Sequence, residues 1–288
     1  MRLRIWGCRG SVPTPGEEAL RYGGNTPCVE VTVADEAPII LDAGTGIRKL
    51  GLTLAARDVR ALHLCLTHLH LDHLEGLRFF APLWDERTDL HVWGPPSHLM
   101  TLRERIARSF SPPLFPIDLA DVPARLHFHD TPDRPWSIGS ARLQAASVIH
   151  PGPTLGYRIE AGGSTLAYVP DHEPALGPDP STHALEWLSG SPVAAAANVL
   201  LHDAQFTEAE YRERIGWGHS SVVDTVAYAR ACRVGELVLF HHDPLHGDAD
   251  LDALAATARS LWDGSAGKPP TLAYEGMSFV LADGLVSV

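Results

Sequence analysis

The segment Thr67–His73, Thr-His-Leu-His-Leu-Asp-His, constrains this chain more than any other. Three histidines and one aspartate fall within six positions, directly after the strand-like run Ala61–Leu66. At the chain's own residue frequencies, an H-x-H-x-D-H pattern would arise by chance roughly 0.003 times. Side chains two apart on an extended segment point the same way, so His68 and His70 should converge. If a helix follows, the last two ligands turn toward a second position, and the segment predicts a site for two metal ions.

Other histidines and aspartates follow strand-like runs farther along the chain. They are His150 after Ala141–Val148, Asp171 after Ser164–Val169, His202 and Asp203 at the end of Asn198–Leu201, and His241 and His242 after Glu236–Phe240. A further one, His219, lies in Gly-Trp-Gly-His-Ser-Ser just before an expected helix. Strand ends converge on one edge of a sheet, where active sites form. The 16 histidines of the chain are therefore informative because many of them share this position.

Short apolar or alternating runs bounded by Gly, Pro, Asp or Asn predict many strands. Besides those above, the expected strands are Arg2–Trp6, Cys28–Val33, Ile39–Leu41, Leu90–Trp93, Arg125–His129, Thr154–Glu160 and Ser278–Leu281. The expected helices are Gly46–Ala56, Ser97–Phe110, Ser221–Ala231 and Asp250–Trp262. Most runs before residue 170 follow one another without a helix-length gap, which favours antiparallel or mixed sheets. No linker divides the chain, so residues 1–288 are interpreted as a single domain.

Composition excludes several classes of protein. Lysine and arginine number 23 against 35 acidic residues, giving a formal charge of −12, and this disfavours binding of long nucleic acid. No apolar stretch is long enough to span a membrane, and the first residues do not resemble a signal peptide. The four cysteines are far apart, which predicts buried free thiols in a reducing compartment. We therefore expect a cytoplasmic protein without membrane partners.

The segment His68–His73 resembles the signature of the metallo-β-lactamase superfamily. This resemblance spans nearly the whole chain and implies an α/β (α+β) fold, a four-layer αββα sandwich with two mixed sheets and a dinuclear metal site at one edge. The C-terminal half is similar to the phosphodiesterase branch, which includes ribonuclease Z and cyclic-nucleotide phosphodiesterases. Leu200–Phe206 (LLHDAQF) is similar to a hydrophobic-H-E-A-T-F segment of that branch, with Asp203 in place of Glu, and Gly218–Ser221 (GHSS) is similar to its G-H-S-T.

The resemblance implies a ligand set for two Zn²⁺ per chain, with Mn²⁺ or Fe as alternatives. One metal would be held by His68, His70 and His150. The other would be held by Asp72, His73 and a C-terminal histidine, with Asp171 bridging both. His241 is preferred over His242 for that last ligand, and the two remain alternatives. Asp42 is implied as a residue that supports the ligands from behind.

Proton transfer needs further groups. His219 is the expected donor to the leaving alkoxide, and Asp203 would hold it charged and oriented. A positive helix N-terminus beyond His219 would lower its pKa, so the pairing with Asp203 is required. Asp72 would bind metal and also orient the attacking hydroxide. The expected substrate contacts, from sequence proximity, are His242, Trp217 and Ser220.

The resulting hypothesis is a metal-dependent phosphodiesterase that acts on small diesters such as cyclic nucleotides. A tRNA 3′-processing endonuclease of the ribonuclease Z type is the first alternative, but there is little room for its tRNA-gripping arm between His150 and His202. A lactone or thioester hydrolase on the same fold, and a binding module without catalysis, are further alternatives. Relatives of this type are often dimers, and the proline-rich loop Ser111–Pro116 could cross the interface of a homodimer.

Overall fold

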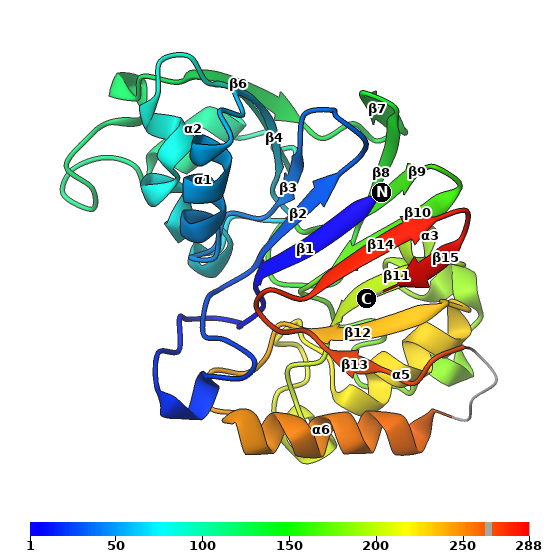
Figure 1. Ribbon diagram of the computed structural model, residues 1–288. Helices are drawn as coiled ribbons and strands as arrows, with labels where there is room; N and C mark the ends of the chain where they lie inside the picture. Colours follow the sequence, from blue (N-terminus) through cyan, green and yellow to red (C-terminus); the bar gives the residue numbers. More distant parts are fainter. Residues whose placement is uncertain (263–266, 288) are drawn as a thin grey trace.

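The computed structural model describes residues 1–262 and 267–287, and within them the chain forms two mixed β-sheets packed face to face (Figure 1). The first sheet has the order β15-β14-β1-β2-β3-β4-β5-β6. Its strands are β1 (Arg2–Gly7), β2 (Cys28–Thr32), β3 (Ile39–Leu41), β4 (Ala61–Cys65), β5 (Asp89–Gly94), β6 (Arg125–Asp130), β14 (Ser278–Ala282) and β15 (Leu285–Ser287). Strands β3 to β6 run parallel, while β1, β2 and β14 pair antiparallel.

The second sheet has the order β13-β12-β11-β10-β9-β8-β7. Its strands are β7 (Trp136–Ile138), β8 (Ala141–Ser147), β9 (Leu155–Ala161), β10 (Ser164–Val169), β11 (Val199–Asp203), β12 (Glu236–Phe240) and β13 (Thr271–Leu272). Strands β10 to β13 are parallel, and β11 is buried along its whole length. Its Val-Leu-Leu run is typical of a central parallel strand covered on both faces.

Helices cover the outer face of each sheet. Those associated with the first sheet are α1 (Ile47–Ala56) and α2 (Leu102–Ala107). Those associated with the second sheet are α3 (Ser191–Ala194), α5 (Val222–Ala231) and α6 (Asp248–Leu261), while α4 (Glu208–Arg212) lies in the connection between β11 and α5. One apolar core lies between the two sheets, and each sheet has one further core on its outer face, against its helices. This arrangement confirms the expected αββα sandwich.

Most expected elements are present, and the differences have local causes. The helix expected over Ser97–Phe110 is shorter, because α2 begins only after Thr101, its N-cap. The Thr101 hydroxyl accepts from the Glu104 backbone N–H, and the Glu104 carboxylate accepts from the Thr101 backbone N–H, which completes a capping box. Ser221 caps α5, since its Oγ accepts from the Asp224 N–H at 3.0 Å. Three short strands (β7, β13, β15) and two short helices (α3, α4) were not expected, because two to five residues carry too little periodic signal.

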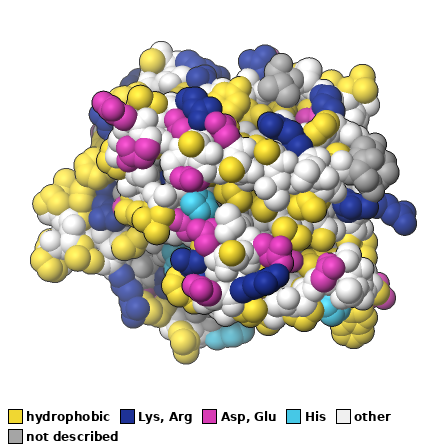
Figure 2. All heavy atoms as spheres, turned by 90° about the horizontal axis from the view of Figure 1, so that it is seen from below, with side chains coloured by type: hydrophobic (Ala, Val, Ile, Leu, Met, Phe, Trp, Pro, Cys, Tyr) yellow, Lys and Arg dark blue, Asp and Glu magenta, His cyan; other side chains and the backbone are white. Residues whose placement is uncertain are grey.

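Two surface properties bear on function. The loop Ser111–Pro116 extends beyond α2, and Leu114 on it is exposed. On the face that carries α6, acidic and basic side chains are interspersed rather than gathered by sign (Figure 2). Arg21, for example, pairs there with Asp252 at 2.7 Å. Among the described residues, no helix combines the length and apolar character needed to cross a membrane.

Candidate metal centre

The strand ends bring the predicted site residues to one edge of the sandwich. The loop after β4 carries the His68–His73 segment, and its last three residues form a 3₁₀ turn, Leu71–His73. Asp171 follows β10, Asp203 ends β11, and His241 follows β12, which are neighbouring strands in the second sheet. Because the two sheets face each other, these loops meet from opposite sides.

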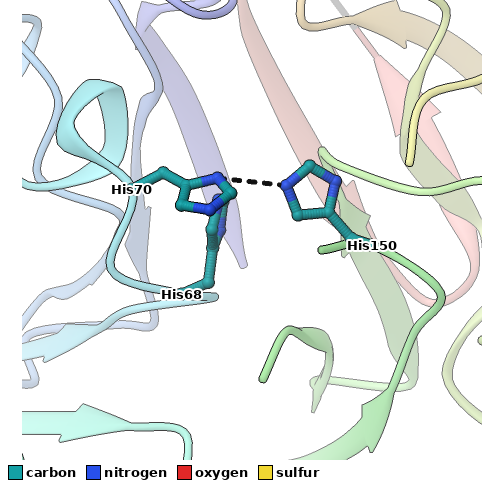
Figure 3. Close-up of side chains that lie close together, drawn as sticks. All are labelled: His68, His70 and His150. Atoms are coloured by element: carbon teal, nitrogen blue, oxygen red, sulfur yellow. Dashed lines mark hydrogen bonds between the residues drawn. The ribbon is translucent and has the colours of Figure 1, made fainter. Parts of the chain in front are cut away.

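His68, His70 and His150 form the first group of potential ligands (Figure 3). Their ligand atoms all lie within 4.8 Å of one another. His68 and His70 come from one side and His150 from the other, with His150 Nε2 3.1 Å from His70 Nδ1. The two histidines two residues apart therefore converge, as their spacing predicts.

Asp72, His73, Asp171 and His241 form the second group, and all four are buried. His241 Nε2 lies 3.2 Å from Asp72 Oδ2 and 3.3 Å from His73 Nε2. Asp171 lies between the groups. Its Oδ2 is 3.7 Å from His150 Nε2 and 3.4 Å from His241 Nε2. All seven predicted ligands are thus gathered in two adjoining groups that share one carboxylate.

Each buried imidazole is oriented through its outward nitrogen. The outward partners are Thr67 Oγ1 for His68 (3.0 Å), Gly218 O for His150 (2.8 Å), Asp42 Oδ2 for His73 (2.8 Å) and Gln205 Oε1 for His241 (3.0 Å). The Nε2 atoms then face the interior of the site, as second-layer hydrogen bonds require in metal centres. His68 Nε2 is buried without a hydrogen-bond partner among the described residues. Imidazole and carboxylate donors with such an orphaned nitrogen fit a divalent transition metal.

Burial and charge set the protonation of this edge. Burial lowers the pKa of His68 well below its ordinary value and also lowers the pKa of His150, so both imidazoles are neutral near pH 7 and able to bind metal. Burial also opposes the charge of His73, but the Asp171 and Asp72 carboxylates outweigh it and raise the His73 pKa well above its ordinary value. The carboxylates therefore create a negative potential that suits a cation.

Asp42 supports the ligands, as the resemblance implies. It is fully buried, with φ of 60°, a left-handed conformation that aspartate tolerates better than most residues. Besides His73 Nδ1, its carboxylate accepts the Thr67 backbone N–H at 2.7 Å and the Tyr168 hydroxyl at 2.9 Å. Asp42 therefore ties the start of the ligand loop to β10.

His219 and Asp203 form a close pair beside the two groups. His219 Nδ1 lies 2.6 Å from Asp203 Oδ2, and the His219 ring stacks on His241 with centroids 5.0 Å apart. Burial opposes the charged imidazole, yet the Asp203 carboxylate dominates and raises the pKa of His219 to about 9. Cations bound nearby would lower that value through repulsion. The pairing expected from the sequence is present.

The three expected substrate contacts have different placements. His242 is buried, with Nε2 2.8 Å from the Ala273 carbonyl and its ring against Tyr22. Ser220 is also buried and donates to the His172 carbonyl at 2.6 Å. Neither placement supports contact with substrate, because His242 Nε2 and Ser220 Oγ are each engaged by a backbone carbonyl inside the fold. Trp217 is 60% exposed in the loop before His219.

Two buried residues that position this loop and its ligands were not predicted. Glu173 accepts the backbone N–H groups of Gly216 and Gly218, at 2.9 Å each, and the Tyr211 hydroxyl. It therefore holds the segment whose Gly218 carbonyl orients His150. Gln205 orients His241. Each lies two residues from a predicted site residue, Asp171 or Asp203, and that proximity was the available signal.

The loop that contains Ser11 borders the site. The Ser11 backbone N–H donates to Asp72 Oδ2 at 2.9 Å. This hydrogen bond places the segment Gly7–Ser11 at the border of the site.

A cavity of about 340 Å³ opens beside the first group of ligands. It is lined by His68, Leu69, His70, Pro95, Ser97, Leu99, Arg105, Pro151, Gly152 and Pro153. A larger cleft of about 560 Å³ lies between β1, β2 and α1 and contains none of the predicted site residues. The smaller cavity adjoins the candidate ligands His68 and His70, and its volume suits a small molecule.

Comparison with known proteins gives consistent matches. A family model described as the beta-lactamase superfamily domain matches residues 38–242. A ribonuclease Z of Thermoplasma acidophilum is 25% identical over 286 residues, covering 85% of this chain and 87% of the relative. A ribonuclease Z of Haloferax volcanii is 26% identical over 313 residues, covering 92% of each chain.

Solved structures share the fold. The metallo-beta-lactamase fold protein YhfI from Bacillus subtilis superposes with a TM-score of 0.67 at 17% identity, covering 97% of this chain and 99% of that one. A diphosphatase from the PhnP family gives a TM-score of 0.67 at 16% identity, covering 97% of both chains. At these identities the likeness concerns the architecture.

Proposed function

The chain belongs to the beta-lactamase superfamily, and from this membership we propose that it is a phosphodiesterase that hydrolyses small diesters with two bound divalent cations, Zn²⁺ first among them. One observation carries the proposal: the single carboxylate of Asp171 lies within 4 Å of ligand nitrogens from both histidine groups. His68, His70 and His150 would hold one ion. Asp72, His73 and His241 would hold the other, with Asp171 shared.

Phosphodiester hydrolysis needs a nucleophile and charge neutralisation. When bound, the two cations supply an activated water at neutral pH and neutralise the phosphate oxygens. Asp72 is the residue of this chain that would orient the nucleophile, since the Ser11 N–H already fixes one of its oxygens at 2.9 Å. Thr67, Asp42 and Gln205 hold the imidazoles in place before substrate arrives, which reduces the cost of ordering the site.

The leaving alkoxide needs a proton, and His219 is the proposed donor. Its Nδ1 is engaged by Asp203, so the hydrogen on Nε2 is available for transfer. Asp203 is itself held by the backbone N–H groups of Ser220 and Gln205, at 3.1 and 3.0 Å. This fixed carboxylate keeps the imidazole oriented and favours its charged form.

We propose small diesters, such as cyclic nucleotides, as the substrates. The cavity beside His68 has room for a molecule of nucleotide size. The first relatives carry the name ribonuclease Z, so a tRNA 3′-processing endonuclease is the second candidate. Two features weigh against it. The segment between His150 and β11 holds only β9, β10, short 3₁₀ turns and α3, and the formal charge is −12.

The decisive experiment is hydrolysis of bis(p-nitrophenyl) phosphate by protein stripped of metal and then refilled with Zn²⁺ or Mn²⁺. We expect no turnover after stripping and recovery on refilling. A cyclic-nucleotide panel and a precursor tRNA, assayed on the same sample, then separate the two candidates. A protein that holds two ions and cleaves none of these phosphodiesters would refute the proposal and direct the search to lactones and thioesters.

A further inference from the structure

A second gathering of histidines lies within the first sheet, on strands rather than at strand ends. His63, His91 and His127 occupy paired positions on β4, β5 and β6. Their rings stack in a row, with centroids 5.0 Å apart between His63 and His91 and 4.6 Å between His91 and His127. These three residues, together with Asp89 and His129, are named the histidine ladder below.

The ladder lies on a face of the sheet that solvent reaches. Along β5, Leu90 and Val92 are buried in the core that includes α1, so Asp89 and His91 point to the opposite face. Trp93, which points to the same face of β5, is partly buried against the core between the two sheets. The side chains of His91 and His127 are 35% and 45% exposed. Solvent therefore reaches both side chains.

Three ladder residues offer ligand atoms at one point. One atom each from Asp89, His91 and His127 lies within 4.8 Å of the other two. Asp89 Oδ1 is 2.6 Å from His127 Nε2 and 4.0 Å from His91 Nε2. This oxygen is buried and faces both imidazoles, while Oδ2 of the same carboxylate pairs with Arg125 at 3.2 Å. Oδ1 is thus the carboxylate oxygen that an ion held by both imidazoles would contact.

His129 fixes the orientation of His91. His91 Nδ1 lies 2.9 Å from His129 Nε2, and the His129 ring stacks on Trp93 with centroids 4.2 Å apart. If the shared hydrogen resides on His91 Nδ1, the lone pair of His91 Nε2 points toward Asp89. This is the arrangement by which an outer partner orients a metal-binding imidazole.

We propose that Asp89, His91 and His127 form an additional metal site that binds one late first-row divalent cation, such as Zn²⁺ or Ni²⁺. Two imidazoles and one carboxylate suit such ions, and water can complete the coordination. The bound ion would link β5 to β6, which is one of the two edge strands of the first sheet. The ion would then stabilise β6, which as an edge strand is hydrogen-bonded to only one neighbouring strand.

Metal counting tests the site. Metal-free protein is dialysed against excess Zn²⁺, washed, and analysed by inductively coupled plasma mass spectrometry. The double variant His91→Ala/His127→Ala should hold one ion per chain fewer than the wild type. The matched control, His183→Ala, removes an exposed histidine outside both clusters and should hold the wild-type number. Equal metal content in the double variant and the wild type would overturn the proposal.

A milder variant guards against misfolding. His127→Gln changes only a half-exposed side chain on the edge strand, so its fold should persist. Added Zn²⁺ should raise the unfolding temperature of the wild type more than that of His127→Gln, and an equal rise would contradict the site. Diesterase turnover of the ladder variants should match the wild type. Failure of the ladder site and failure of the proposed function are therefore separate outcomes.

Discussion

The metal centre and the histidine ladder use the same residue type in opposite settings. At the metal centre, six of the seven predicted ligands are buried, and the imidazoles of His73 and His241 are held from behind by Asp42 and Gln205. In the ladder, the side chains that offer ligand atoms are about two-fifths exposed, and only His91 has a comparable outer partner. Buried, pre-oriented ligands favour tight binding and chemistry. Half-exposed ligands on a sheet favour a weaker, structural role.

The largest effect should come from the residue that joins the two halves of the metal centre. Asp171→Asn should reduce diester turnover by more than about 100-fold, the upper range for residues that only support a ligand from behind. It should also remove metal from the centre while leaving the ladder's ion in place. Turnover assays and metal analysis on the same sample measure both. Asp133→Asn, at an exposed aspartate, is the control, and full activity in Asp171→Asn would remove the basis of the comparison.

His219→Ala tests whether His219, beside the metal centre, donates the proton to the leaving alkoxide. General acid catalysis contributes about 10²–10⁴-fold, so turnover of a diester with an alkoxide leaving group should fall by that order. The loss should be much smaller with bis(p-nitrophenyl) phosphate, because p-nitrophenolate leaves without a proton. Metal content should not change. Equal losses on both substrates would assign His219 a purely structural role.

Asp42→Asn tests whether the hydrogen bond between Asp42 and His73 orients that imidazole for metal binding. Asparagine tolerates the positive φ of this position, so the backbone should be kept, but one of the two acceptor oxygens is replaced by a donor. Metal affinity of the centre should fall by about 10–100-fold, as for other outer partners. A chelator competition titration measures this affinity. Unchanged affinity would mean that the His73–Asp42 contact does not orient the ligand.

The sequence predicted one cluster because its pattern is local. Four of the seven ligands lie within six residues, and the other three follow strands whose ends converge. The choice between His241 and His242 depended on the backbone: His241 has φ of 59° and faces Asp72, whereas His242 faces Ala273. The general class of fold was accessible in the same way, since strand runs and one motif both indicate it.

The ladder could not be predicted, since its residues meet only through sheet order. His63, His91 and His127 are separated by helices and long loops, and the spacings Asp89-x-His91 and His127-x-His129 do not by themselves show that the two strands are neighbours. Their pairing depends on β4, β5 and β6 being adjacent, parallel and in one register. A residue shift of one in β6 would turn His127 to the buried face and expose Phe128. Cross-strand clusters of this kind become visible only once register is known.

The smallest effect should be seen in metal-free protein. His127→Ala removes a half-exposed side chain on an edge strand, and such surface changes usually alter the free energy of unfolding by no more than about 0.5 kcal/mol. With Zn²⁺ at 100 times its dissociation constant, a ladder site that binds only the folded chain should add about 2.7 kcal/mol to the free energy of unfolding. The His127→Ala variant should lack this addition. Thermal unfolding of Asp171→Asn and Asp171→Asn/His127→Ala, with and without Zn²⁺, isolates this contribution, because the metal centre is disabled in both. If Zn²⁺ stabilises the two proteins equally, the exposed histidines do not bind the ion. Of the two clusters, only the metal centre would then bind metal, and the ladder would be a stack of rings.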